Sequence, residues 1–410
     1  MVFYCQRHCY ETKYTTKVVS CKPAKIDVVV DGKKKKTACY EVTFEDTILF
    51  PEGGGQPDDR GTAGGVEVVR VVRRGGEAVH YLAGGLEEGA TVTQEVDWTR
   101  RHDHMQQHSA QHLVTAVADN LYGFATTSWY LGEAVCHIEL HTGQVTEEEM
   151  AKIEDTANQK IRESTPVTIA EYQASDPRLI EIRTRGLPED VVGAVRVVSI
   201  EGVDANMCCG THVDSMADLQ AVKLLHTEKG KAGKTLLFFV AGSRLLSYLG
   251  ECVSRERGLN TLLHSCPADH TRLVEKNQKE LKGAQKSLRE ALKDLAVCEA
   301  KTFLGVEPRP PAFFHHRHDG DNDYLSAIIN EINDESVLKV LTAGEDKGPG
   351  ILVVHGPPAL VAQIGPRVCE ILEGRGGGKT RFSGKVTRLG KRKEAEKYVL
   401  GALNGSVKET

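Results

Sequence analysis

Hydrophobic and polar positions in the first 95 residues follow the pattern of short β-strands. Stretches rich in β-branched residues are separated by turns of Gly, Asp and Lys. The segment DGKKKK, between two of these stretches, is interpreted as the solvated tip of a hairpin. The pattern predicts a β-barrel-like N-terminal domain over residues 1–95, with strands at Lys17–Cys21, Ile26–Val30, Ala38–Phe44, Val66–Val72 and Thr91–Val96.

From Asp97 onward the pattern changes to a mixture of helices and strands. Apolar residues recur at helical spacing over His104–Tyr122, which predicts a helix there. Thr146 and Glu149 form a capping box that begins a second helix, and Pro166 ends it. With the strand-like stretches that follow, the pattern predicts an α+β core over residues 96–255; these stretches are Val167–Glu171, Ala194–Ile200, Leu219–His226 and Thr235–Ala241.

Residues 256–306 are expected to form a linking helix. Val274, Leu281, Leu288 and Leu295 recur at intervals of seven residues. The companion positions are polar or small, so any coiled coil would be narrow. A single linking helix and the seam of a homodimer explain this pattern equally well.

The Pro-rich stretch Glu307–Pro311 closes the linking helix, and residues 307–410 are expected to form a C-terminal α/β domain. Helices are expected at Tyr324–Ile332 and near Pro358–Glu373, with strands near Val337–Thr342 and Gly350–Val354. The predicted fold class is therefore α+β. It combines a β-barrel-like domain, an α+β core, a linking helix and an α/β domain, the last also a candidate for homodimer contacts.

Composition narrows the class of protein. The chain has 410 residues, enough for several domains, and 11 cysteines without a secretory pattern, which favours reduced thiols and metal binding. No apolar stretch is long enough to span a membrane, so we expect a cytoplasmic protein without a membrane partner. The net charge of −5 gives no sign of nucleic-acid binding, but two local stretches are basic. They are Lys33–Lys36 and Arg375–Lys393, which carries eight Lys or Arg and no acid.

Histidines provide the first candidate chemistry. In RHDHMQQHSAQHL, His104, His108 and His112 follow one another at i, i+4 steps on one helix face, and two imidazoles so spaced can share a metal. Spacing does not decide between His104 with His108 and His108 with His112. A metalloprotease would need a Glu directly after His108, where Ser109 stands.

A second pair of metal-ligating residue types lies about 100 residues later, in NMCCGTHV. Cys208 precedes His212 by four residues and Cys209 precedes it by three, so either thiol can reach a metal shared with His212. Two histidines with one further cysteine and one further histidine would fill the four-coordinate shell that zinc prefers. The two pairs together predict one zinc ion per chain.

Three motifs in this order and spacing, PEGGGQPDDRG, HMQQHSAQHL and MCCGTHV, resemble the editing domain of alanyl-tRNA synthetases. That domain also occurs in free-standing alanyl-tRNA editing proteins, the AlaX family, and the resemblance to its long form runs nearly end to end. The family pattern of H-x3-H followed by C-x3-H implies His108, His112, Cys208 and His212 as the zinc ligands. Cys209 stands where the family usually has glycine, and His104 falls outside the pattern.

The resemblance implies hydrolysis of the ester in mischarged tRNA for alanine. Serine is the expected amino acid, and glycine is a second candidate. Four protein ligands leave no obvious open position on the zinc, so one ligand could yield, the coordination could expand, or the metal could mainly orient the substrate. We expect no serine or cysteine nucleophile.

Further site residues follow from the same resemblance. The Gly-rich run is expected to line the editing pocket, with Gln56 offering a donor and an acceptor, and Thr126 or Thr127 to sense the hydroxyl of serine. The basic stretch resembles the C-terminal domain of alanyl-tRNA synthetases, where phosphate contacts are expected. The expected substrate contacts are Gly53, Gly54, Gly55, Lys379, Arg381 and Lys385.

Two other classes of function remain open on the sequence. A tRNA-binding or scaffold protein could hold the zinc for structure alone, and a zinc hydrolase could act on a small ester. Cys5-x3-Cys9 is interpreted as buried or exposed thiols rather than a second zinc site, and His315–His318 as a surface cluster.

Overall fold

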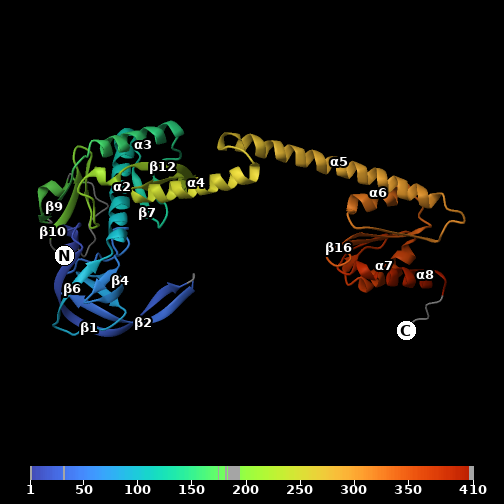
Figure 1. Ribbon diagram of the computed structural model, residues 1–410, viewed down its shortest axis with the longest axis horizontal. Coiled ribbons are helices and arrows are strands. Elements are labelled where there is room, and N and C mark those ends of the chain that lie inside the picture. The colour runs from blue at the N-terminus through green and yellow to red at the C-terminus, as the bar shows by residue number, and fades with distance from the viewer. Residues whose placement is uncertain (1, 31–32, 174, 181, 183–193, 406–410) are drawn as a thin grey trace. The chain divides into compact units, whose positions relative to one another are not determined.

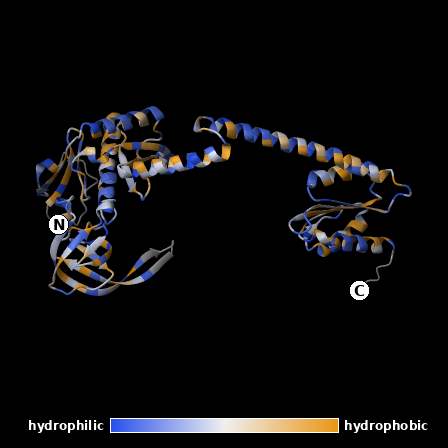
Figure 2. Cartoon of the chain, viewed as in Figure 1, coloured by the Kyte–Doolittle hydropathy of each residue, from blue (hydrophilic) through white to orange (hydrophobic). Residues whose placement is uncertain are grey.

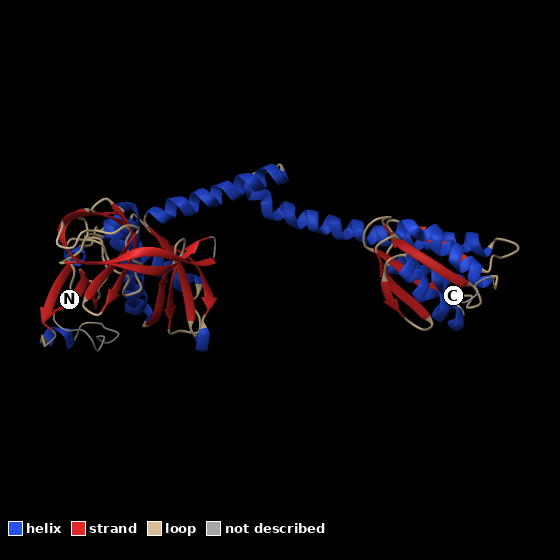
Figure 3. Cartoon of the chain, turned by 90° about the horizontal axis from the view of Figure 1, so that it is seen from below, coloured by secondary structure: helices blue, strands red, loops and turns tan. Residues whose placement is uncertain are grey.

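The structure is a computed structural model that describes residues 2–30, 33–173, 175–180, 182 and 194–405 (Figure 1). The chain forms two compact units, Met1–Gly258 and Leu259–Thr410, and each is described by itself. Both units combine helices and strands (Figure 3), which confirms the mixed α+β class. None of the described helices has the length and hydropathy needed to cross a membrane.

The first unit begins with a six-stranded sheet closed into a barrel, in the order β1-β2-β5-β4-β3-β6. The ring closes because β1 pairs with both β2 and β6, antiparallel in each case. Val42, Leu49, Val68 and Leu82 belong to the apolar cluster that fills it. A short helix precedes the sheet, and the elements are α1 (Tyr4–Arg7), β1 (Lys13–Val30), β2 (Lys33–Phe44), β3 (Gly61–Ala63), β4 (Val66–Arg74), β5 (Glu77–Leu82) and β6 (Thr91–Val96).

Three features of this sheet differ from the expected pattern. Lys17–Cys21 and Ile26–Val30 are parts of one strand, β1, because the intervening residues stay in register with β2. The lysine run is not a turn, since Lys33 already pairs with Val30; Asp31 and Gly32 lie outside the described residues. Strands β3 and β5 were not predicted, because β3 is too short to show a pattern.

The second part of the first unit surrounds a buried helix, α2, with two sheets. Asp97 caps its start by accepting a hydrogen bond from the Arg100 amide, and Gly123 ends it with a φ of +67°. The sheets have the orders β11-β10-β9 and β12-β13-β8-β7. The elements are α2 (Trp98–Tyr122), β7 (Thr126–Leu131), β8 (Cys136–Leu140), α3 (Glu147–Arg162), β9 (Val167–Gln173), β10 (Ala194–Ile200), β11 (Asp204–Met207), β12 (Val222–Lys229) and β13 (Thr235–Ala241).

Several predictions for this part are confirmed. The Thr146–Glu149 capping box is present at the start of α3, and β10 and β13 have the expected bounds. Helix α2 begins six residues before the predicted His104, because Asp97 supplies the cap. Thr126 and Thr127 begin strand β7, which pairs with β8 and was not predicted.

Two helices follow, α4 (Ser243–Leu263) and α5 (His270–Leu304). The linking helix expected over residues 256–306 is not one helix in the structure, because residues 256–263 belong to the end of α4 and α5 begins at His270. Hydrophilic and hydrophobic residues alternate along α5 (Figure 2). Leu281 and Leu288 of the seven-residue repeat are 59% and 56% exposed. The buried residues of α5 lie elsewhere, at Leu292, Ala296, Ala300 and Phe303. The homodimer seam stays a prediction.

The C-terminal domain is a five-stranded sheet with helices on both faces. The strand order is β14-β15-β16-β18-β17, with β14 and β15 parallel and the other pairs antiparallel. Leu341 and Val353 pack with α5 and α6, whereas Leu352 and Val354 pack with α7 and α8. The elements are β14 (Ala312–Arg317), α6 (Asn322–Ile332), β15 (Leu338–Gly344), β16 (Gly350–His355), α7 (Pro358–Ile371), β17 (Arg375–Gly377), β18 (Arg381–Val386) and α8 (Arg392–Leu403).

The histidines predicted as a surface cluster are mostly part of this sheet. His315 and His316 lie in β14 and are partly buried. The Nε2 atom of His315 lies 2.8 Å from the Tyr324 hydroxyl, and His316 Nδ1 lies 3.0 Å from the Thr342 hydroxyl. His315 and His316 are partly buried because they lie within the sheet. His318 follows the strand and is exposed, as expected.

Candidate metal centre

Two segments distant in the sequence bring four metal-ligating side chains together. His108 and His112 lie one turn apart on α2 and are buried. Cys208 and His212 lie in the loop that follows β11. One donor atom from each of the four lies within 4.8 Å of the others, and no other such cluster occurs among the residues that the structure describes. The two pairs from the sequence therefore meet, and the group could hold one metal ion.

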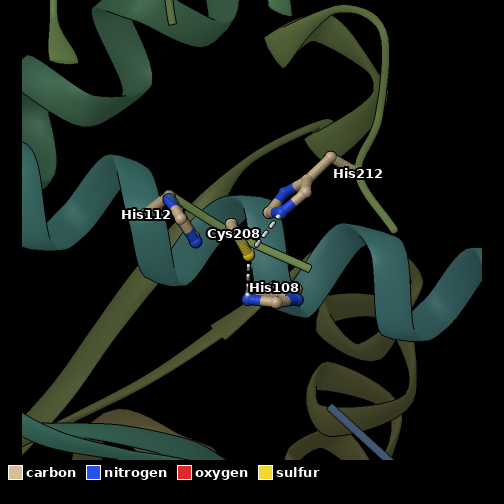
Figure 4. A group of neighbouring side chains, drawn as sticks. All are labelled: His108, His112, Cys208 and His212. Atoms are coloured by element: carbon tan, nitrogen blue, oxygen red, sulfur yellow. Dashed lines mark hydrogen bonds between the residues drawn. The ribbon is translucent and has the colours of Figure 1, made fainter. Parts of the chain in front are cut away.

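The sulfur of Cys208 faces the ring nitrogens of two histidines. His212 Nε2 lies 3.2 Å from Cys208 Sγ, and His108 Nε2 lies 3.5 Å from it. Figure 4 shows all four side chains converging on one point from α2 and the loop. His104 and Cys209 are outside this cluster, which agrees with the ligand set that the family pattern implies.

Protein partners fix which nitrogen of His108 is free for a metal. His108 Nδ1 lies 2.9 Å from Gln56 Oε1, and the Thr211 amide donates to the same oxygen at 2.9 Å. A carboxamide oxygen only accepts, so Nδ1 carries the proton and Nε2 keeps its lone pair. Gln56 is 1% exposed, and its amide also donates to the Thr211 hydroxyl. Gln56 thus lies behind a ligand rather than in an open pocket.

His212 has a similar arrangement. Its Nδ1 lies 3.1 Å from the Ser109 hydroxyl, which also accepts a hydrogen bond from the Val213 amide. This contact orients the ring so that Nε2 faces Cys208. Metal-binding histidines usually have such a partner at the other ring nitrogen. The sequence did not predict the roles of Ser109 and Thr211 or this role of Gln56. The one available signal was the polar residue Ser109 directly after His108.

Burial sets the charge of these groups. It lowers the pKa of His108 and His212 well below the ordinary value, with neighbouring histidines and Arg196 adding to the effect. Burial raises the pKa of the Cys208 thiol to about 12, and the neighbouring Cys209 adds to it. Neutral imidazoles are the ligating form, and a divalent cation would offset the cost of a buried thiolate. The donor set therefore fits a metal ion.

Backbone contacts hold the cysteine loop against the ligand helix. Arg196, on β10, donates from Nη1 to the carbonyl oxygens of Cys208 and Gly210, at 2.9 and 2.7 Å. A Cβ on Gly210 would lie 2.2 Å from His108 Cε1, so no larger residue fits there. The glycine of MCCGTHV is thus needed for close packing on a ligand.

Cys209 faces the Gly-rich loop of the barrel rather than the metal site. A Cβ on Gly54 would lie 2.9 Å from Cys209 Sγ, and one on Gly55 would lie 2.3 Å from Trp129 Nε1. Both glycines have positive φ angles, +61° and +79°. The glycines of this run therefore permit close contact with Cys209 and Trp129.

A buried ion pair joins the barrel to α2. Arg101 donates from Nε to both carboxylate oxygens of Asp59, at 3.1 and 2.9 Å, and both side chains are fully buried. Its other nitrogens donate to the carbonyl oxygens of Cys9 and Ile48. Asp59 lies shortly after the Gly-rich run, so this pair fixes the loop relative to the helix that carries the histidines.

The two candidate selectivity residues point to different neighbours. Thr126 Oγ1 lies 3.2 Å from the hydroxyl of Thr115 on α2, which also accepts from Gln111 Nε2. Gln111 directly precedes His112, and its buried Oε1 has no donor among the described groups. Thr127 instead donates to Glu139, whose pKa Lys234 and Thr127 hold at about 2. The geometry therefore places Thr126, not Thr127, beside the ligand helix.

The remaining candidates lie outside this centre. Lys379, Arg381 and Lys385 belong to the second unit, in or near β18, with Lys379 and Lys385 exposed. Arg381 donates to the Ser326 hydroxyl at 2.9 Å. Cys5 and Cys9 are buried free thiols, as expected.

Comparison with known proteins gives a consistent result. Residues 195–237, which include Cys208 and His212, match the family described as the threonyl and alanyl tRNA synthetase second additional domain. The chain is 50% identical over 397 residues to alanyl-tRNA editing protein Aarsd1-B of Xenopus laevis, covering 97% of this chain and 96% of that protein. It is 48% identical to alanyl-tRNA editing protein Aarsd1 of Rattus norvegicus, with 97% of each chain covered. The putative alanyl-tRNA editing protein alaX of Saccharomyces cerevisiae is 27% identical, with 94% and 93% covered.

Proposed function

The chain belongs to the family of alanyl-tRNA editing proteins, and on that premise we propose that it hydrolyses the ester of tRNA for alanine that carries serine. Glycine is the second candidate for the amino acid removed. The observation that supports this proposal most is the buried four-donor cluster, in which two ligand histidines have their metal-facing nitrogen fixed by Gln56 and Ser109.

Zinc is the metal that we propose for this cluster. Three imidazoles and one thiol are ligands that zinc prefers, in the number that its tetrahedral sites use. A zinc ion held by His108, His112, Cys208 and His212 would supply Lewis acidity to the ester carbonyl. Gln56 and Ser109 keep two of these ligands oriented, and Arg196 holds the loop that carries the thiol.

The other expected roles remain proposals. Gly53 and Gly54 lie close to Cys209, and Gly55 lies close to Trp129. We propose that the backbone of this run contacts the terminal nucleotide or the amino acid. Lys379, Arg381 and Lys385 are proposed to contact tRNA phosphates. We also propose the division into domains at residues 95, 255 and 306, and a cytoplasmic location.

Deacylation of Ser-tRNA for alanine tests the proposed function. The purified protein is expected to release serine at a rate that falls to background after a chelator removes the metal and returns when zinc is added back. Correctly charged Ala-tRNA is the control and is expected to stay intact. The metal content is measured in the same samples to show that chelation succeeded. Full activity in a sample that has lost its metal would contradict the proposal.

A tRNA-binding protein with a structural metal is the second candidate. Four protein ligands complete a tetrahedral shell, which is typical of structural zinc sites. That function predicts a folded, metal-loaded protein that binds tRNA and leaves the ester intact in the same assay.

Selectivity is expected to depend on Thr126 more than on Thr127. A hydroxyl that pairs with serine discriminates against alanine, because it is left unpaired when the substrate lacks its partner. Thr126→Val is expected to slow Ser-tRNA cleavage about tenfold or more with metal content unchanged, whereas Thr127→Val is expected to act weakly because its hydroxyl bonds Glu139. The ratio of serine to alanine release is the measurement. Equal ratios in the parent and both variants would remove the two residues from this role.

A further inference from the structure

Strands β1 and β2 continue beyond the barrel as a two-stranded ribbon. Strand β1 pairs with β6 only through Lys13–Lys17, and β2 pairs with β5 only through Tyr40–Val42. In the described ladders, residues 24–30 and 33–39 therefore pair only with each other. Figure 1 shows this ribbon projecting from the barrel without another element against it. At about 3.3 Å per residue, these seven residue pairs extend roughly 20 Å.

The ribbon and its base form one of two basic stretches in an acidic protein. Residues 22–39 contain six lysines and two aspartates, whereas the whole chain has a net charge of −5. Lys22, Lys25 and Lys36 are exposed, and Asp27 lies opposite Lys36 in the ladder. The remaining lysines follow Gly32 at the far end of the ribbon, so positive charge is concentrated where the ribbon is farthest from the barrel.

We propose that this ribbon binds the phosphate backbone of the substrate tRNA, an inference that rests on the proposed function. The net charge of −5 opposes binding of a polyanion, so phosphates are expected to bind at local basic patches such as this ribbon. Lysines neutralise phosphates and release condensed counterions, which gives affinity without base selection. Residues 22–39 contain no aromatic side chain, so base stacking of the kind that single-stranded RNA modules use is absent from this segment.

Two consequences separate this role from that of the metal centre. The ribbon is expected to bind uncharged tRNA as well as aminoacylated tRNA, because it does not contact the ester. Its loss is expected to raise KM for Ser-tRNA and to leave kcat and the serine-to-alanine ratio unchanged.

The test removes the lysine run and measures tRNA affinity as a function of salt. The ribbon variant carries K33Q, K34Q, K35Q and K36Q. A matched control removes the same charge from α5, where two of the four exposed lysines pair with Glu280 and Glu290; it carries K276Q, K279Q, K282Q and K286Q. A third variant, with arginine at the four ribbon positions, keeps the charge. Circular dichroism and metal content are compared for all of them.

The ribbon variant is expected to bind uncharged tRNA about tenfold more weakly at physiological salt, with the slope of log affinity against log salt reduced by about 2–4. The arginine variant and the α5 control are expected to keep the parent slope. A parent slope in the ribbon variant would overturn the proposal and leave its lysines the role of preventing strand addition at open edges. An equal decrease in the α5 control would also overturn it, because net charge alone would then explain binding.

The binding measurement does not depend on hydrolysis. If the parent binds tRNA through the ribbon and leaves the ester intact, the ribbon inference stands and the proposed function fails. If the parent cleaves Ser-tRNA and the ribbon variant keeps its slope, the proposed function stands and the inference fails.

Discussion

Cys208→Ala is expected to lose the metal and to reduce deacylation to background, whereas Cys209→Ala keeps both. Cys208 Sγ lies 3.2 and 3.5 Å from the Nε2 atoms of His212 and His108, so its removal takes away the only thiol among the four donors. Cys209 lies next in the chain, but its sulfur packs against Gly54. Metal analysis and Ser-tRNA deacylation of the two purified variants are the measurements.

The two adjacent cysteines form a matched pair, since each variant removes one sulfur from the same loop. Equal metal loss in both would contradict the ligand assignment. Cys208→His serves as a further check, because an imidazole is also a zinc ligand. If this variant keeps part of the metal, the loss in Cys208→Ala is due to the missing ligand and not to misfolding of the loop.

Arg101→Met is expected to lower the free energy of unfolding by about 3–5 kcal/mol, because it leaves the Asp59 carboxylate buried without its partner. The same change removes the donors to the carbonyl oxygens of Cys9 and Ile48. Denaturant unfolding followed by circular dichroism measures the effect. Metal affinity is also expected to fall, since Arg101 lies on the helix that carries the ligand histidines.

A surface ion pair provides the control. Arg7 contacts Glu171 with side chains that are 47% and 28% exposed, so Arg7→Met is expected to cost less than about 1 kcal/mol. The double variant Asp59→Leu with Arg101→Met is expected to recover part of the stability, because it leaves no buried charge. Similar losses for Arg7→Met and Arg101→Met would show that the buried pair has no special role.

Local sequence patterns predicted those helices that have capping residues and regular apolar spacing. The capping box at Thr146 and the helical spacing in α3 involve residues close in sequence, and both appear in the structure. Helix α2 was shorter in the prediction because its first turns contain polar and basic residues, which suggest an exposed segment. One of them, Arg101, is fully buried against Asp59, a contact that no local pattern reveals.

The same limit applies to the candidate centre. Spacing allowed His104 with His108 as well as His108 with His112, and it left both Cys208 and Cys209 as partners of His212. The family resemblance made both choices. The contacts of Gln56 with His108 and Thr211 join residues 52 and 155 positions apart, so neither could be derived from periodicity. Strand β7 was missed because its Thr- and Ser-rich start is also typical of turns.

The position of Gln56 has a consequence for how this protein could be divided. Its side chain comes from the N-terminal domain but completes contacts to a ligand and to the cysteine loop of the next one. A fragment that begins after residue 95 would keep all four metal-binding side chains and lose the partner that sets the tautomer of His108. The barrel and the core are therefore not interchangeable modules: a graft of the core onto another protein would have to supply an acceptor at this position and a partner for the buried Arg101.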